Sequence, residues 1–307
     1  MDLQPCGGFS FNQDEPTHVP QMLIDAGHLS LREIAGWTPP QSTEEEERGI
    51  ATQSAEVASG EFERTRAQVR DALRAIIGSV ITAFNIPCRQ GGIDIGSGAT
   101  GEMVNQLLKP YIQGAESSWA QVEINPKAVA MNRKRNPLAT VIEGSYFQLA
   151  NDLRLQNTNM IAGLSCLDAT YFLPQVIASV RNSLRENGYL LHIQDVRPGD
   201  GVGFRYMQRH GYQLPYKALM LPNGNPLLYP VQNGMAISVG EMLREELGDA
   251  ITNTPDMELL YNGWVEAHRA PPHNIARLYY LNTLLGVAPP AEESISAIIT
   301  VARKKAA

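Results

Sequence analysis

Short apolar runs alternate with amphipathic segments through the middle of the chain. The runs predicted to be buried strands are GIDI (92–95), WAQVEI (119–124), ATVIEG (139–144), NMIAGLS (159–165) and GYLLHIQD (188–195). The segments predicted to be helices between them are 101–111, 125–135 and 173–187. Strands and helices that alternate at this spacing form crossover units around a parallel sheet. Because such crossovers are right-handed, the pattern predicts a doubly wound α/β fold.

Two helices are predicted before this region. Residues 61–84 carry apolar side chains three and four positions apart, which is typical of an amphipathic helix. Its apolar stripe can pack on the core or serve as a lid over a site, and the two are compatible. Earlier, Ser42 or Thr43 can cap a helix whose first turn holds the glutamates of TPPQSTEEEER. We interpret this acidic run as a solvated helix start, and residues 1–85 as an N-terminal helical extension or lid.

The alternation stops after residue 195. Residues 197–237 are rich in Gly, Pro and aromatic residues, and we interpret them as an insertion that contacts a substrate. A helix is predicted over 238–251 and a strand over 294–305, with no element assigned to 256–268. We therefore expect residues 86–307 to form one domain that contains the sheet and this insertion.

The composition narrows the class of protein. Of 307 residues, 43% are hydrophobic and 19% charged, which is ordinary for a globular protein. The net charge of −7 argues against nucleic-acid binding, which needs clustered Lys and Arg. No apolar run approaches the roughly 18 residues that span a bilayer, and the first ten residues lack the features of a signal peptide. Three scattered cysteines without a CxxC pair indicate reduced thiols. We expect a cytoplasmic protein.

A glycine-rich turn, GSGATG, follows the first predicted strand. Gly96, Gly98 and Gly101 lie where the carboxyl end of that strand meets a helix. In a doubly wound sheet, ligands bind beyond the carboxyl ends of the strands. Glycine lets the backbone approach a ligand without a Cβ clash. The same spacing also suits a tight turn that binds nothing.

Two acidic residues distinguish these alternatives. Asp94 lies two residues before Gly96 and would repel a pyrophosphate, so it disfavours a dinucleotide and an oxidoreductase that uses one. Glu123 ends the second predicted strand, where a carboxylate can accept both hydroxyls of a ribose. Glu123 alone could equally be a surface residue. Together with the glycines, the two acids describe a site for a cation that carries a ribose.

These motifs resemble those of a known family. IDIGSGATG, VEIN, VIEGSYFQL, NMIAGLSCLDAT and LRENGYLLHIQD are similar, in order and spacing, to the motifs of class I S-adenosylmethionine-dependent methyltransferases over about residues 88–195. The resemblance implies S-adenosylmethionine (SAM) as the cofactor. It also implies a Rossmann-like fold with a mostly parallel, seven-stranded sheet.

The resemblance assigns roles to residues at the strand ends. It places the glycines at the methionine part of the cofactor, Asp94 near its amino group and Glu123 on the ribose. Ser145 stands where the family often has an acid that binds adenine, so Tyr146 or Phe147 is a candidate to stack on the base instead. The implied cofactor-binding residues are Asp94, Gly96, Ser97, Gly98, Gly101, Glu123, Ile124, Gly144, Ser145, Tyr146, Ser165 and Cys166.

Polar residues at the later strand ends are candidates for catalysis. They are Asp168, Asp195 and His192 as bases and Tyr171 as an orienting group. His192 lies in an apolar strand and also fits a core histidine. Asp168 and Asp195 resemble the carboxylates that hold magnesium in catechol-type O-methyltransferases, but the sequence offers too few further oxygen ligands, so we expect no metal. SCLDATYF lacks the Pro-Pro-aromatic run of nucleobase and amide methyltransferases.

The sequence as a whole predicts a SAM-dependent methyltransferase. We expect a small-molecule acceptor that is methylated on O, N or C, with neither nucleic acid nor a membrane as a partner. A homodimer is compatible with the sequence. Two alternatives stay open. One is a macromolecular methyltransferase that acts on RNA or protein, and the other is a SAM-binding module without transfer activity.

Overall fold

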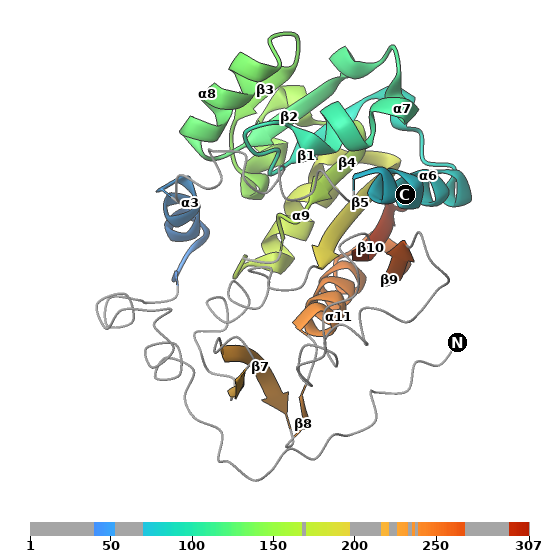
Figure 1. Cartoon of the computed structure of the whole chain (residues 1–307). Coiled ribbons are helices and arrows are strands. Elements are labelled where there is room, and N and C mark those ends of the chain that lie inside the picture. The colour runs from blue at the N-terminus through green and yellow to red at the C-terminus, as the bar shows by residue number, and fades with distance from the viewer. Residues whose placement is uncertain are drawn as a thin grey trace.

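A seven-stranded sheet lies at the centre of the molecule (Figure 1). The structure, a computed structural model, describes residues 40–52, 70–167, 170–196, 216–220, 226–232, 235–236, 239–267 and 295–306. The strand order is β3-β2-β1-β4-β5-β10-β9. The strands are β1 Gly92–Ile95, β2 Trp119–Glu123, β3 Thr140–Glu143, β4 Thr158–Leu164, β5 Leu184–Val196, β9 Met257–Ala267 and β10 Ile295–Lys304.

The sheet is mostly parallel, as the sequence predicts. Strands β1 to β5 pair in parallel, and β10 is antiparallel to both β5 and β9. The chain enters the sheet at β1, moves outward to β3, and returns to the other side of β1 as β4. The direction of winding therefore reverses between β1 and β4. The doubly wound α/β fold is confirmed.

The helices differ from the predicted ones at two places. The main helices are α3 Thr43–Thr52, α6 Arg70–Phe84, α7 Lys109–Ile112, α8 Pro126–Arg135, α9 Leu173–Ser183 and α11 Val239–Thr252. The helix predicted over 101–111 is instead a π-helical segment, η3 (Met103–Leu107), followed by α7. Pro110 has no N–H to donate, so one continuous α-helix cannot run through it.

The helix predicted over 173–187 was too long. It ends at Ser183 because Leu184 already pairs with Thr158 of β4. Asn187 then takes a left-handed φ of 58°, and regular pairing resumes at Tyr189 after a register shift. The segment 256–268, which had no predicted element, forms β9 as far as Ala267.

Apolar side chains cover both faces of the sheet. Successive residues of β4 alternate, so that Met160, Ala162 and Leu164 face one core and Ile161 faces the other. The first core lies under α6, η3 and α7. The second lies under α9, α11 and the 3₁₀ segment η5 (Tyr146–Asn151). The predicted apolar stripe of residues 61–84 is confirmed for its described part, since Leu73, Ile76, Ile77 and Val80 of α6 are buried in the first core.

A small antiparallel sheet lies in the region interpreted as an insertion. It consists of β6 Tyr216–Met220, β7 Pro226–Gln232 and β8 Met235–Ala236. Most of the remaining residues of 197–237 lie outside the described residues. Figure 1 shows β7 and β8 on the side of α11 away from β1 to β3.

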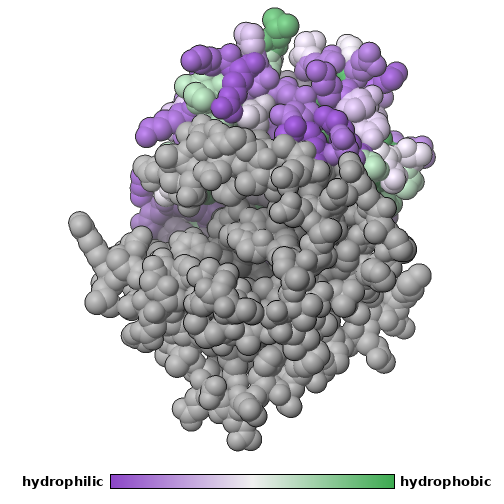
Figure 2. All heavy atoms as spheres, viewed as in Figure 1, coloured by the Kyte–Doolittle hydropathy of each residue, from purple (hydrophilic) through white to green (hydrophobic). Residues whose placement is uncertain are grey.

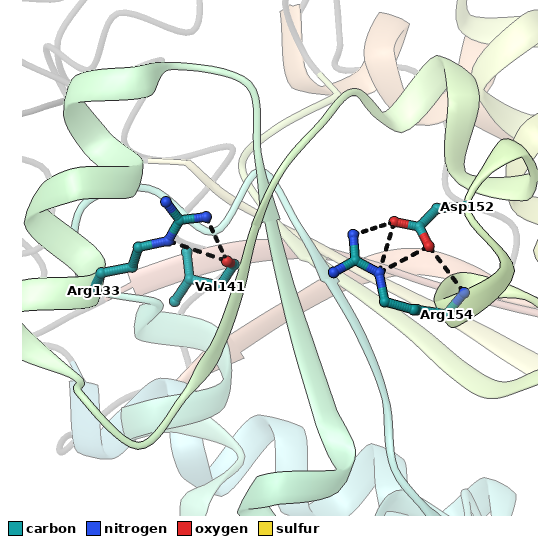
Figure 3. A network of polar contacts seen from close by, with 4 residues as sticks. All are labelled: Arg133, Val141, Asp152 and Arg154. Atoms are coloured by element: carbon teal, nitrogen blue, oxygen red, sulfur yellow. Dashed lines mark hydrogen bonds and ion pairs between the residues drawn. The ribbon is translucent and has the colours of Figure 1, made fainter.

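Polar contacts hold the outer strand β3 to the rest of the fold. The Nε and Nη2 atoms of Arg133 in α8 donate to the carbonyl oxygen of Val141, at 3.3 and 2.9 Å (Figure 3). In the same view, the carboxylate of Asp152 accepts hydrogen bonds from the backbone N–H and the guanidinium of Arg154. Asp152 thereby caps the short segment η6 (Leu153–Leu155). The second pair lies on the surface, where ion pairs add little stability.

The visible described surface is hydrophilic. Figure 2 shows mostly hydrophilic side chains over the end of the molecule that carries α8, β3 and α7. Leu138 and Leu153 are the large hydrophobic side chains exposed among the described residues, and scattered ones of this kind are normal. Within the described part of the chain, no helix combines the length and apolar character needed to cross a membrane.

The docking of α6 gives a prediction. Ile77→Ala should lower the free energy of unfolding by about 2–4 kcal/mol, because Ile77 is fully buried. Ser79→Ala, on the exposed side of the same helix, should change it by about 0.5 kcal/mol or less. Urea denaturation measures both values. Equal effects of the two variants would contradict the packing of α6 in the core.

Candidate functional site

The loops after β1 and β4 meet where the winding of the sheet reverses. A Cβ placed on Gly96, the first residue after β1, would lie 2.6 Å from the Cβ of Cys166, which follows β4. The two turns are therefore in direct contact through a glycine. This is the place where doubly wound sheets bind ligands.

The glycine turn requires glycine for its own geometry. Gly96, Gly98 and Gly101 have φ angles of 62°, 64° and 60°, in the left-handed region that side chains disfavour. A Cβ on Gly101 would also lie 2.1 Å from Oε1 of Gln121. The N–H of Ser97 donates to the carbonyl oxygen of Val122 at 3.1 Å, which ties the turn to β2. These observations alone fit a tight turn, so the case for a ligand depends on the acids beside it.

A network of buried amides, which the sequence analysis missed, holds this turn in place. Asn132 of α8 donates to the carbonyl oxygen of Gly98 at 3.2 Å and to Oε1 of Gln121 at 2.9 Å. Gln121 in turn donates to Oδ1 of Asn105 at 3.0 Å. Asn105 and Asn136 each donate to the carbonyl oxygen of Thr100 at 2.8 Å. A glutamine in the apolar strand 119–123 was the signal that could have revealed it.

Glu123 is buried at the end of β2 and fixed in orientation. Its Oε2 accepts the N–H of Gly98 at 2.9 Å, and its Oε1 accepts the N–H of Asn125 at 2.8 Å. Only 5% of the residue is exposed, so it is not a surface residue at a strand end. A carboxylate offers about four acceptor positions, so two backbone bonds leave capacity for hydroxyl donors of a ligand.

The residues that follow Glu123 are engaged in local structure. Asn125 caps α8, and its Oδ1 accepts the N–H groups of Lys127 and Ala128 at 3.0 and 3.2 Å. Ile124 is half-buried between the strand and this cap. The N–H of Gly144 donates to the carbonyl oxygen of Glu123 at 3.0 Å, which extends the pairing of β2 and β3 by one residue.

Asp94 is a buried carboxylate within β1. It is 1% exposed, and among the described residues neither of its oxygens has a hydrogen-bond partner. Burial raises the pKa of Asp94 well above its ordinary value, with smaller contributions from Glu123 and Glu102, while the nearby backbone N–H of Val104, which is outside hydrogen-bond geometry, lowers it in part. Glu102 is itself buried and pairs with Arg70 of α6 at 3.5 Å. A buried, unpaired carboxylate is unfavourable, so this position favours a cation.

The segment after β3 is largely covered by protein. The Oγ of Ser145 accepts the N–H of Phe147 at 3.1 Å and so caps η5. Tyr146 is 9% exposed, and its ring packs edge-on against Phe147 at 4.8 Å. Phe147 in turn lies 6.4 Å from the ring of Phe172, which follows β4. Stacking of either ring on adenine stays a prediction.

The turn after β4 is sharp. Ser165 has a left-handed φ of 48°, and its N–H donates to the carbonyl oxygen of Ile193 at 2.8 Å. Cys166 is half-buried and forms no disulfide among the described residues. A Cβ on Gly163 would lie 2.8 Å from this sulfur, so the thiol folds back over the end of β4.

Of the four candidates for catalysis, the structure describes the side chains of His192 and Tyr171. Asp168 lies outside the described residues, and for Asp195 the structure places only the backbone, opposite Ala297 of β10. His192 is fully buried in β5 between Gly163 and Thr300, as the alternative of a core histidine requires. Tyr171 lies after β4 and is half-buried. Within the described ranges no group of three or more His, Cys, Asp or Glu side chains could hold a metal ion.

One acidic residue was misinterpreted from the sequence. Glu46 belongs to the run interpreted as a solvated helix start, but it is only 5% exposed. Its carboxylate accepts the hydroxyl of Tyr146 at 3.4 Å and the backbone N–H of Tyr171 at 2.9 Å. The helix start itself is confirmed, with Ser42 as the cap. Burial of Glu46 depends on contacts 100 and more residues away, which a local pattern does not reveal.

Comparisons with known proteins add the following. No family model matches the sequence, and no curated protein sequence matches it. Among solved structures, the plantazolicin methyltransferase BamL, in complex with a triazolic desmethylPZN analogue and SAH, is 11% identical with a TM-score of 0.49, over 85% of this chain and 95% of its own. The Haloferax volcanii complex that contains the Trm112 methyltransferase activator gives 10% identity and a TM-score of 0.46, over 82% and 95%. The N-methyltransferase NodS from Bradyrhizobium japonicum WM9, in complex with S-adenosyl-L-homocysteine, is 10% identical with a TM-score of 0.37, over 70% of this chain and 78% of its own. Identities of 10–11% and TM-scores below 0.5 are too low to transfer a function to this chain.

The raised pKa of Asp94 predicts a stability profile. Because the pKa is higher in the folded than in the unfolded chain, the advantage of the folded state is present below about pH 4 and is lost as the pH rises toward the folded pKa. Asp94→Asn should therefore raise the free energy of unfolding at pH 7 and flatten its pH dependence, because the amide carries no charge that burial would destabilise.

Denaturant titrations between pH 4 and pH 8 measure this effect. Asp249→Asn, an exposed acid on α11, is the control and should leave the profile unchanged. Destabilisation by Asp94→Asn at pH 7 would show that the carboxylate is paired in the folded protein, contrary to its surroundings in the structure.

Proposed function

We propose that the chain is a class I SAM-dependent methyltransferase that methylates a small-molecule acceptor. The observation that carries this proposal is the arrangement of Asp94 and Glu123 around the glycine turn. One is a buried carboxylate without a hydrogen-bond partner among the described residues, and the other is held by two backbone N–H groups. Asp94 lies on β1, beside which the winding of the sheet reverses, and Glu123 ends the neighbouring strand β2.

The residues fit the parts of SAM. Glu123 has the position and acceptor capacity for the ribose hydroxyls. Asp94 supplies a negative charge for the ammonium group, whose binding would neutralise a carboxylate that burial destabilises. The glycine turn lets backbone approach the ligand closely. A dinucleotide fits less well, because its pyrophosphate would meet the charge of Asp94 in the same place.

The reaction would depend on positioning more than on acid–base chemistry. The cofactor, when bound, supplies a methyl group that is already activated on a sulfonium. The chain binds and orients the two reactants and excludes water, and alignment of this kind contributes several kcal/mol, on the order of 7–11 at best. Ser165 and Cys166 border the glycine turn, and we assign them to the reacting end. A base is needed only if the acceptor keeps its proton at neutral pH, and Asp168, Asp195 and Tyr171 stay candidates for that role.

A small molecule is the acceptor class that the chain favours. The net charge is −7, and the described site gathers buried acids, namely Asp94, Glu102 and Glu123. Nucleic acid would be repelled from such a site. A SAM-binding module without transfer activity is the second candidate, because the amide network and the glycine turn serve binding alone equally well. Methyl transfer from labelled SAM to a panel of small acceptors separates the two.

Binding of the cofactor can be tested at Glu123. Glu123→Gln should weaken SAM binding by about tenfold or more, because hydrogen bonds to a charged group contribute about 1.5–3 kcal/mol. Glu143→Gln is a matched control, since Glu143 is exposed and lies directly opposite Glu123 in the pairing of β2 and β3. Calorimetric titration measures both affinities.

NADH provides the second arm of the same experiment. The wild type should bind SAM with micromolar affinity and should not bind NADH. The proposal is wrong if folded wild type binds no SAM, and the role of Glu123 is wrong if both variants bind SAM as the wild type does.

A further inference from the structure

Helix α3 reaches the site through one buried carboxylate. Glu46 accepts hydrogen bonds from the Tyr146 hydroxyl at 3.4 Å and from the Tyr171 backbone N–H at 2.9 Å. Glutamate is rarely buried unless it is paired, and Glu46 is 5% exposed. These two bonds join α3 to two different loops of the sheet edge.

Those two loops flank the glycine turn. Tyr146 follows β3, and Tyr171 follows β4. The pKa of Tyr146 is raised by burial first, then by the carboxylate of Glu46 and by Cys166, and the hydroxyl of Thr170 lowers it in part. The hydroxyl of Thr170 lies near the phenol, and Cys166 packs against the core cluster that contains Tyr146. Since Cys166 also contacts Gly96, Glu46 and the glycine turn border the same packed region.

Further contacts make this arrangement rigid. Ser42 caps α3 by accepting the N–H of Glu45 at 3.3 Å, and Glu45 accepts the N–H of Gln41 at 2.7 Å. The rings of Tyr146, Phe147 and Phe172 pack edge to face across the two loops. Phe172 also donates its N–H to the hydroxyl of Thr170 at 3.3 Å. The capped helix α3 thus places Glu46 against two loops, and ring contacts join these loops to each other.

We propose that Glu46 is a positioning residue of the methyltransferase site. Its carboxylate holds the Tyr146 hydroxyl and the 170–172 segment beside Cys166, and through them α3 keeps the edge of the cofactor site closed. The inference rests on the proposed function. Glu46 acts through these neighbours and does not touch the reacting atoms, so its loss misplaces the edge of the site, and displacements of about 1 Å can lower rates on the order of 100-fold.

The test compares variants on the same helix. Glu46→Ala removes both hydrogen bonds, whereas Glu46→Gln keeps the size of the side chain and an acceptor oxygen. Glu47→Gln is the control, because Glu47 also contacts η5, through Gln148 at 3.1 Å, but on the surface. The dissociation rate of methyl-labelled SAM from the full chain, followed by a chase with unlabelled SAM, is the readout.

We expect Glu46→Ala to speed SAM dissociation about tenfold or more, Glu46→Gln to restore the rate to within about threefold of wild type, and Glu47→Gln to change nothing. A purely structural role would lower thermal stability and leave the dissociation rate of the folded protein unchanged, and that result overturns the inference. If Glu46→Ala does not fold, Tyr146→Phe tests the inference instead, because it removes only the hydroxyl that donates a hydrogen bond to Glu46. An unchanged rate in Tyr146→Phe then overturns the inference.

The two proposals fail in different ways. If the wild type binds SAM and the Glu46 and Tyr146 variants release it at the wild-type rate, only the positioning role is wrong. If the wild type binds no SAM, the proposed function is wrong and the positioning role is overturned with it.

Discussion

Asp94 lies on β1 with β2 on one side and β4 on the other, and its carboxylate is buried. A charge in this position is destabilising unless something neutralises it. Its acidic neighbours, Glu102 and Glu123, increase that cost, and Arg70 is engaged with Glu102. Three acids around one turn lower the stability of the folded protein when no ligand is bound. Binding of a cation would recover that stability, which is why this turn is the centre of the proposed site.

The surrounding structure makes the turn ready for a ligand. The amide network fixes the carbonyl groups of Gly98 and Thr100, and Glu123 fixes the N–H of Gly98. Because these groups are already ordered, a ligand loses little affinity to ordering them. The contact of Gly96 with Cys166 also fixes the loop after β4 against the glycine turn. Glu46 of α3 is hydrogen-bonded to the loops after β3 and β4. The proposed cofactor site and α3 are thus connected through packed residues.

The sequence predicts β1 to β4 to within about a residue, because buried parallel strands are short apolar runs that glycine and polar turns interrupt. It also predicts the position of Asp94, the glycines and Glu123, since strand ends are local features. Leu184 and Asn187 were placed in a helix because their pairing with β4 is not local. The burial of Glu46 and the network of buried amides were missed for the same reason, because their contacts are not local either. Asn105, Gln121 and Asn132 are polar residues of ordinary appearance, and only the folded chain brings them together.

The most direct test is a crystal structure of the chain with S-adenosylhomocysteine bound. The account predicts that both ribose hydroxyls lie within about 3 Å of the Glu123 carboxylate and that the amino group of the ligand approaches Asp94. The glycine turn should keep its present conformation, since it is already ordered. A ligand bound elsewhere, or one that leaves Asp94 and Glu123 with only their present neighbours, would contradict the assignment of the site.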